Sequence, residues 1–172
     1  MAVFGLQTVS GATLEKLTVE QMAEKSTLIV RGRVTGCTGE SQGSMIFTRC
    51  TATVSETWKG SGSPNVSFLT PGGTFRGLVQ TFVGTPSMNS GEEYVLFLWA
   101  GRSRRYQIIG LSQGVFDIAL APGGPAKANR AAAKETMLDS TGRVIADEAV
   151  STTVDALRAR VRKAIATAGA AK

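Results

Sequence analysis

Side chains that could do chemistry are few and scattered in this sequence. Its 172 residues include two cysteines and no histidine. The missing imidazole excludes histidine-assisted serine or cysteine nucleophiles and histidine-ligated zinc or iron, and two cysteines are too few for a four-cysteine metal site. Carboxylates adjoin at Glu92-Glu93 and Asp147-Glu148, but neighbours along a strand point to opposite faces. We therefore expect no enzymatic activity, no cofactor and no metal site.

The two cysteines, Cys37 and Cys50, flank a predicted hairpin loop of 12 residues. A disulfide between them would staple the first two strands and add about 3 kcal/mol of stability. Strict alternation opposes this pairing, because it places Cys37 on the face of the strand's arginines and Cys50 on the apolar face of its partner. A bulge at Gly36 would reset the alternation. A disulfide and two unpaired thiols are both compatible with the pattern.

Arginines form the main candidate binding surface. The net charge is +6. A positive charge of this kind keeps a protein soluble or attracts an anionic partner. The candidate anion-binding face comprises Arg31, Arg33 and Arg49 on the first two strands and Arg102, Arg104 and Arg105 in a later turn. Sheets that bind single-stranded nucleic acid add aromatic side chains that stack on bases, whereas the outward positions here hold Arg, Thr and Ser. A solvated face is therefore favoured over a nucleic-acid interface.

The elements that must position these residues are mostly strands. A capping box at Thr18 and Gln21 predicts a short helix over 18–25. Alternating apolar residues then predict strands over 27–34, 46–59, 66–70, 92–100, 106–110 and 115–120, with a weaker one over 76–83. The segment 94–99 is apolar at every position, which indicates a strand covered on both faces.

The ends of the chain carry two further features. Thr152-Thr153 predict the start of a C-terminal amphipathic helix over 153–167, with the apolar stripe Val154, Leu157, Val161 and Ile165. We expect this stripe to pack on the barrel that the predicted strands form, with a membrane or a second subunit as the alternatives.

The extended N-terminal segment 1–13 has the apolar anchors Val3, Phe4, Leu6 and Val9 and could add a strand to a neighbour's open edge. No apolar run reaches the roughly 18 residues that cross a bilayer.

Four motifs occur in chain order: Ser26-Thr27-Leu28-Ile29-Val30-Arg31-Gly32-Arg33-Val34, then Thr51–Trp58 followed by Lys59-Gly60, then Gly91-Glu92-Glu93-Tyr94-Val95-Leu96-Phe97-Leu98, and Gly110-Leu111-Ser112-Gln113-Gly114. Together they resemble the netrin-like OB-fold superfamily that includes tissue inhibitors of metalloproteinases, and look closest to uncharacterised secreted bacterial proteins of that shape. Metalloproteinase inhibition does not carry over, because it needs an N-terminal cysteine and the first cysteine here is Cys37.

The resemblance implies a mainly β fold: a five-stranded OB-like barrel with a short N-terminal helix and a C-terminal amphipathic helix. The expected organisation is an arm over 1–13, the barrel over 14–120, a strap or linker over 121–150, and the helix and tail over 151–172. It also implies a secreted, cell-surface or periplasmic protein whose leader is absent from this chain.

We expect a non-enzymatic interaction or structural module whose partner is a protein, foremost itself, in filaments or other assemblies made through the N-terminal arm. The alternatives are an oligonucleotide-binding OB-fold protein and an inhibitor or carrier of a partner enzyme.

Overall fold

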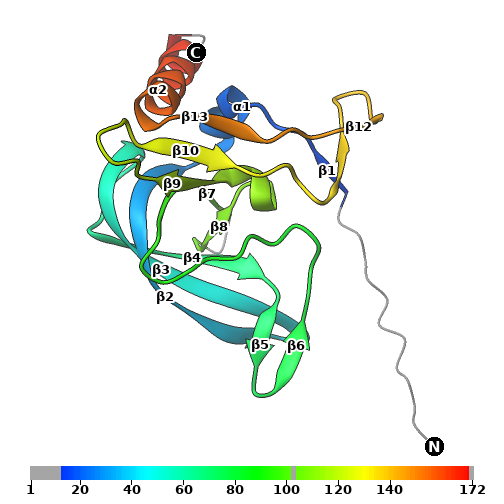
Figure 1. Cartoon of the computed structure of the whole chain (residues 1–172). Coiled ribbons are helices and arrows are strands. Elements are labelled where there is room, and N and C mark those ends of the chain that lie inside the picture. The colour runs from blue at the N-terminus through cyan, green and yellow to red at the C-terminus, as the bar shows by residue number, and fades with distance from the viewer. Residues whose placement is uncertain (1–12, 102–103, 171–172) are drawn as a thin grey trace, which may run out of the picture.

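The computed structural model describes residues 13–101 and 104–170 (Figure 1). Helix α1 (Val19–Lys25) confirms the predicted short helix. The Thr18 hydroxyl accepts a hydrogen bond from the Gln21 amide, and the Gln21 side chain accepts one from the Thr18 amide. This capping box satisfies two amides that the first helical turn leaves without partners, so the helix begins where the sequence predicts.

A long antiparallel ribbon of two strands follows α1. Strands β2 (Leu28–Gln42) and β3 (Met45–Lys59) have 15 residues each and turn at Gly43 and Ser44. The prediction of a 12-residue loop between the cysteines was therefore wrong, because both strands continue past Cys37 and Cys50 with unbroken pairing. The polar, glycine-containing residues 38–42 do not look like a strand in isolation, but pairing with β3 holds them extended.

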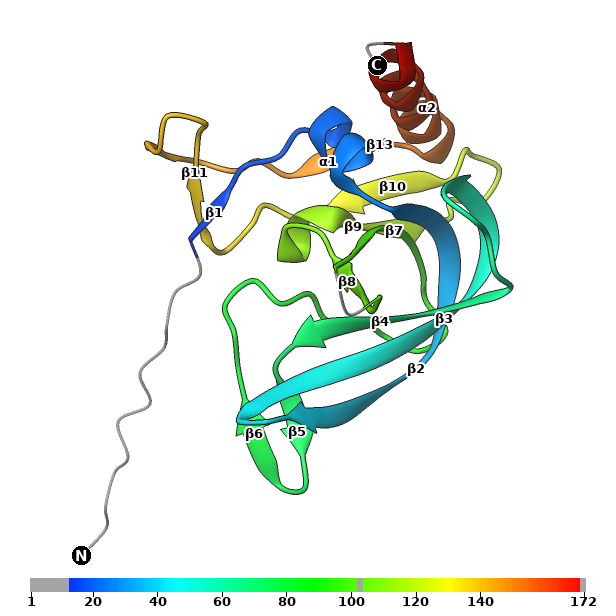
Figure 2. The same cartoon turned by 180° about the vertical axis from the view of Figure 1, so that it is seen from behind.

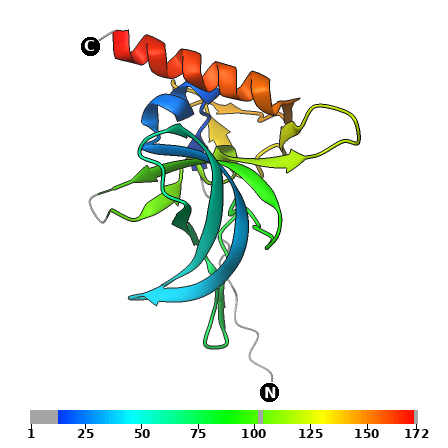
Figure 3. The ribbon, with the colours of Figure 1, turned by 90° about the vertical axis from the view of Figure 1, so that its left-hand side faces the viewer.

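The main sheet has eight strands in the order β13-β10-β9-β7-β2-β3-β4-β8 (Figures 1 and 3). The strands not yet defined are β4 (Asn65–Pro71), β7 (Glu93–Ala100), β8 (Tyr106–Ile108), β9 (Val115–Ala119), β10 (Lys127–Arg130) and β13 (Val150–Thr153). Strand β8 pairs with β4 in parallel and with β7 antiparallel. Strand β8 has only three residues, and two of them pair with β4. This short contact does not close the sheet into a clear barrel.

Strands β8 and β9 share the same edge of β7. Leu98 pairs with Ile108 of β8, while Leu96, two residues earlier, pairs with Val115 of β9. Between the two short strands the chain leaves the sheet and forms the 3₁₀ helix η1 (Leu111–Gly114). The segments predicted over 106–110 and 115–120 are thus two halves of one interrupted partner of β7.

The predicted strand over 76–83 is replaced by a hairpin. Strands β5 (Gly73–Phe75) and β6 (Leu78–Gln80) pair with each other and form a separate two-stranded sheet. Arg76 and Gly77 lie between them with φ of 49° and 81°. Two left-handed residues in succession are typical of the type I′ turn that joins strands directly, and this turn lies inside the predicted strand.

Residues 121–150, predicted as a strap or linker, contain strands in two sheets. Strand β10 pairs with β9 and β13 and so extends the main sheet. Strands β11 (Thr136–Leu138) and β12 (Val144–Ile145) form a small sheet with β1 (Thr13–Glu15), in the order β1-β11-β12 (Figure 2). These strands have two to four residues each, too short to show a period-two pattern in the sequence.

Strand β7 separates two hydrophobic clusters. Val95 and Phe97 face one cluster, and Tyr94, Leu96 and Leu98 face the other. Helix α2 (Val154–Ala170) covers the first cluster with the buried residues Val154, Leu157, Val161 and Ala164, and it lies beside α1 (Figure 3). The Thr153 hydroxyl accepts a hydrogen bond from the Ala156 amide and caps this helix. The predictions of a strand covered on both faces and of a C-terminal helix packed on the sheet are both confirmed.

Candidate interaction surface

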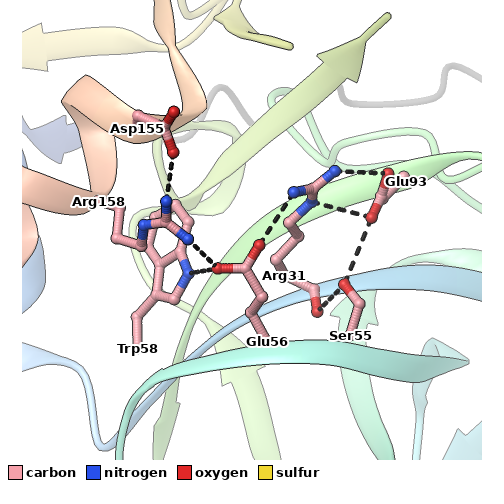
Figure 4. A network of polar contacts seen from close by, with 7 residues as sticks. All are labelled: Arg31, Ser55, Glu56, Trp58, Glu93, Asp155 and Arg158. Atoms are coloured by element: carbon pink, nitrogen blue, oxygen red, sulfur yellow. Dashed lines mark hydrogen bonds and ion pairs between the residues drawn. The ribbon is translucent and has the colours of Figure 1, made fainter. Parts of the chain in front are cut away.

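The arginines of the predicted anion-binding face do not gather into a free basic surface. Arg31 donates to both carboxylate oxygens of Glu93, at 2.9 and 3.2 Å, and to Glu56 at 2.9 Å (Figure 4). Ser55 closes the group, because its hydroxyl lies 3.1 Å from the Arg31 carbonyl and 3.4 Å from Glu93. Arg31 is therefore neutralised by two carboxylates on the neighbouring strands β3 and β7.

Glu56 links this group to helix α2. Its second oxygen accepts hydrogen bonds from the Trp58 indole at 3.0 Å and from Arg158 at 2.6 Å, and Arg158 also pairs with Asp155 (Figure 4). Burial acts to raise the pKa of Glu56, but the hydrogen bonds from Trp58, Arg158 and Arg31 outweigh it and leave the pKa below its ordinary value. These contacts fasten α2 to the β2–β3 ribbon.

The other predicted arginines lie elsewhere. Arg49 and Arg105 both pair with Glu40, at 2.6 and 3.0 Å, towards the far end of the ribbon from Arg31. Arg33 is exposed and donates to the Gly91 carbonyl, and Arg104 is exposed in the turn before β8. Arg102 lies outside the described residues. The structure thus separates these arginines, and Arg31, Arg49 and Arg105 pair with carboxylates.

Cys37 and Cys50 face each other across the ribbon and form a disulfide, with their Cα atoms 4.1 Å apart. The pairing becomes possible because the register shifts between Val34 and Gly36, which leaves Thr35 without a partner in the register. The extra residue resets the alternation of side chains, as the alternative with a bulge near Gly36 required. The disulfide clamps the ribbon just beyond this bulge.

Two adjacent apolar side chains are exposed on the β5–β6 hairpin, which projects from the end of the molecule opposite α2 (Figures 1 and 2). Leu78 and Val79 on β6 are 67% and 68% exposed. Beside them, the tip of the β2–β3 ribbon and the hairpin line an open groove of about 510 Å³. The lining residues include Ser44, Ile46 and Phe75, and the Arg76 guanidinium lies 5.2 Å from the centre of the Phe75 ring.

This hairpin is held firmly at its base. The Ile46 amide donates to the Gln80 side chain at 2.7 Å, and the Gly72 amide donates to the Ile46 carbonyl at 2.7 Å. The Thr48 hydroxyl donates to the Gly72 carbonyl at 2.8 Å. Since an isolated two-stranded hairpin is marginal in water, these bonds from β3 keep Leu78 and Val79 in a defined position.

The sequence contains one signal for this hairpin, the pair Arg76-Gly77 between Phe75 and the apolar pair Leu78-Val79. The anchors of the predicted assembly arm, Val3, Phe4, Leu6 and Val9, lie outside the described residues.

Among residues 13–101 and 104–170, no helix has the length and apolar character needed to cross a membrane, and no three potential metal-ligating side chains cluster. No protein-family model matches the sequence. A search of curated proteins likewise gives no match.

Proposed function

We propose that this protein is a non-enzymatic interaction module of the extracellular space or the cell envelope that assembles with copies of itself. Its core is proposed to be OB-like and netrin-like. The order β2-β3-β4-β8-β7, with β8 parallel to β4 and antiparallel to β7, supports this because the OB-fold is a five-stranded, partly open barrel. The Cys37–Cys50 disulfide supports the location, since disulfides persist in oxidising compartments.

The exposed β5–β6 hairpin is the observation that carries the assembly proposal. Within the described residues, strand β6 pairs with β5 alone, so its other edge is open there. Phe75 and Leu78 are the pair next to the turn. Along an antiparallel strand the backbone amide and carbonyl groups point alternately to the partner strand and away from it. The amide and carbonyl of Val79, the next residue, therefore point towards the open edge. An edge strand with exposed apolar side chains is a template for pairing with another chain.

The occupant we propose for this edge is the N-terminal arm, residues 1–12, of a second copy. This segment has no charged side chain and contains the four apolar anchors already named. Such a strand matches the chemistry of the hairpin, where Leu78, Val79 and the groove beside them offer apolar contacts. Each copy would donate one arm and accept one, which generates a chain of subunits unless the contact closes into a ring.

Two variants separate the donor from the acceptor. Deleting residues 1–12 removes the arm and leaves the hairpin intact, whereas Leu78→Ser with Val79→Ser removes the apolar acceptor and leaves the arm. We expect the full chain to form assemblies whose mass rises with concentration, measured by sedimentation velocity, and each variant to be monomeric. Mixing the two variants should restore one-to-one pairs, because one variant supplies the arm and the other the hairpin. These pairs should not grow into larger assemblies.

Leu120→Ser is the matched control, because Leu120 is 70% exposed but lies at the end of β9, away from the hairpin. It should assemble like the full chain. A full chain that stays monomeric at all concentrations, or assemblies that persist unchanged in either variant, would contradict the proposal.

The two alternatives have less support. An oligonucleotide-binding surface would need free cations, and Arg31, Arg49 and Arg105 pair with carboxylates. Binding of a labelled single strand that weakens steeply with salt would nevertheless establish it. A monomer that copurifies with an enzyme would favour the inhibitor or carrier.

A further inference from the structure

A half-open cavity of about 310 Å³ lies where the main sheet approaches the small one. Its walls come from residues 84–87, from η1, from β9 and from residues 130–135. At roughly 30 Å³ for each molecule of water, it has room for a small ligand. Thr85, Ser87 and Ser112 are among the lining residues, and the Thr85 hydroxyl already donates to the Pro71 carbonyl at 3.0 Å.

The carboxylate of Glu135 borders this cavity and is poorly paired. Glu135 is 6% exposed. The Ser112 hydroxyl lies 3.1 Å from one of its oxygens and 3.4 Å from the other, but a hydroxyl has a single proton to donate. Within the described ranges no Lys or Arg forms an ion pair with Glu135. An ionised carboxylate buried without a cation or further donors is costly.

Gly84 makes room for this carboxylate. A Cβ atom at position 84 would lie 1.9 Å from the carboxyl carbon of Glu135, and the Gly84 φ of +85° also disfavours any other residue. The loop therefore closes over the carboxylate and keeps it at the cavity wall.

The cations nearby do not neutralise Glu135. The Arg130 guanidinium is bound to Asp147, at 2.7 and 3.1 Å. Lys134 lines the cavity but is exposed and makes no ion pair among the residues that the structure describes. Asp117 adds a second carboxylate to the wall. Burial, and to a lesser extent Glu92, raises the pKa of Asp117, which is a further sign of underpaired negative charge here.

We propose that this cavity binds a primary ammonium group, with the Glu135 carboxylate as its acceptor. An ammonium group has three donors, which the two oxygens of Glu135 and the adjoining Ser112 hydroxyl can accept. The shared chemistry allows two sources, a small free amine or the lysine side chain of a protein. This site is separate from the hairpin and does not depend on self-assembly.

The test is a titration of the full ¹⁵N-labelled chain followed by the backbone amide signals of Gly84, Ser112 and Glu135. Propylammonium chloride represents a free amine, and Nα-acetyl-lysine methylamide represents a lysine side chain. We expect saturable shifts with both probes and none with tetramethylammonium chloride, which has the same charge but no N–H donor. Tighter binding of the lysine probe would assign a protein as the source, and tighter binding of propylammonium a small amine.

Glu135→Gln, which keeps the shape and removes the charge, should raise the dissociation constant at least tenfold. Glu148→Gln is the control, because Glu148 is an exposed carboxylate outside the cavity wall, and it should bind as the full chain does. Ser87→Phe, at an exposed position of the wall, blocks the cavity without altering Glu135 and should also abolish binding. Absence of saturable shifts at 100 mM probe, equal shifts with tetramethylammonium, or undiminished binding in Glu135→Gln would overturn the proposal.

Discussion

At the scale of single residues, the structure uses charged side chains mainly as connectors between segments that are distant in the chain. Arg31 joins β2 to Glu56 and Glu93, which are 25 and 62 residues away. Arg158 joins α2 to Glu56 across 102 residues. Exposed ion pairs contribute little to stability, but these are half-buried and share partners, so their main effect is to fix how the elements meet.

The ion pair between Arg130 and Asp147 is the most deeply buried of these connectors. Their side chains are 8% and 1% exposed, and Asp147 also accepts from the Ala133 amide at 2.8 Å. Removing one member of a buried pair leaves the other charge without compensation. We expect Asp147→Asn to lower the free energy of unfolding by about 3 kcal/mol, measured by guanidinium denaturation.

Asp155→Asn is the comparison for this prediction, because the Asp155 side chain is 78% exposed although it also pairs with an arginine. It should change the free energy of unfolding by less than about 1 kcal/mol. Equal effects of the two substitutions on the free energy of unfolding would show that burial does not determine how much the Asp147 pair contributes to stability.

At the scale of elements, the β2–β3 ribbon organises the fold. Strand β2 pairs with β3 and β7, and β3 continues the sheet to β4. The far half of the ribbon extends beyond β7 towards the β5–β6 hairpin (Figure 1). Strand β2 pairs with β7 up to Arg33, and Cys37 follows shortly after this point. The disulfide thus joins β2 to β3 where β2 has left β7, while β3 still pairs with β4.

Replacing both cysteines by serine should weaken the ribbon without changing the fold. The bond closes a loop with a sequence separation of 13 residues, for which the chain-entropy argument gives about 3 kcal/mol. We expect this loss in the free energy of unfolding by guanidinium denaturation. Faster amide hydrogen exchange should appear first in residues 38–49. Wild-type protein with the disulfide reduced should behave like the double variant, and unchanged exchange in that segment would contradict a clamping role.

At the scale of the whole molecule, carboxylates with lowered pKa values couple stability to pH. The pKa of Asp147 is lowered from 3.8 to about 2: burial acts to raise it, but hydrogen bonds from Arg130 and Ala133 outweigh that effect. The pKa values of Glu20, Glu40 and Glu56 are lowered as well, because hydrogen bonds from the Glu20 amide, from Gln42 and from Trp58, respectively, together with arginine contacts, outweigh burial. Such groups contribute stability above their unfolded pKa, and this contribution is lost as the pH falls through the folded pKa.

We therefore expect the free energy of unfolding to decrease as the pH falls from about 5 to 2. Asp147 alone accounts for about 2 kcal/mol of the decrease, so Asp147→Asn should show a shallower slope over this range. Asp117 has a raised pKa and acts in the opposite direction. Guanidinium denaturation at pH 6, 4 and 2.5 measures both slopes, and a stability independent of pH would contradict the prediction.

Features set by neighbours in the chain were predictable from the sequence alone. The capping box placed α1 within one residue, the apolar run at 94–99 indicated the strand buried on both faces, and the stripe at Val154, Leu157 and Val161 identified α2 and its buried face. Each of these depends on residues a few positions apart, where periodicity and capping act directly.

Tertiary structure alone decided the rest. The pairing of Arg31 with Glu93, the burial of Glu135 against Gly84 and the attachment of the β5–β6 hairpin to Ile46 join residues between 34 and 62 positions apart. Local patterns carry no information about such partners, because these residues meet only in the tertiary structure. The two candidate sites, the open edge of β6 and the cavity beside Glu135, arise in this way.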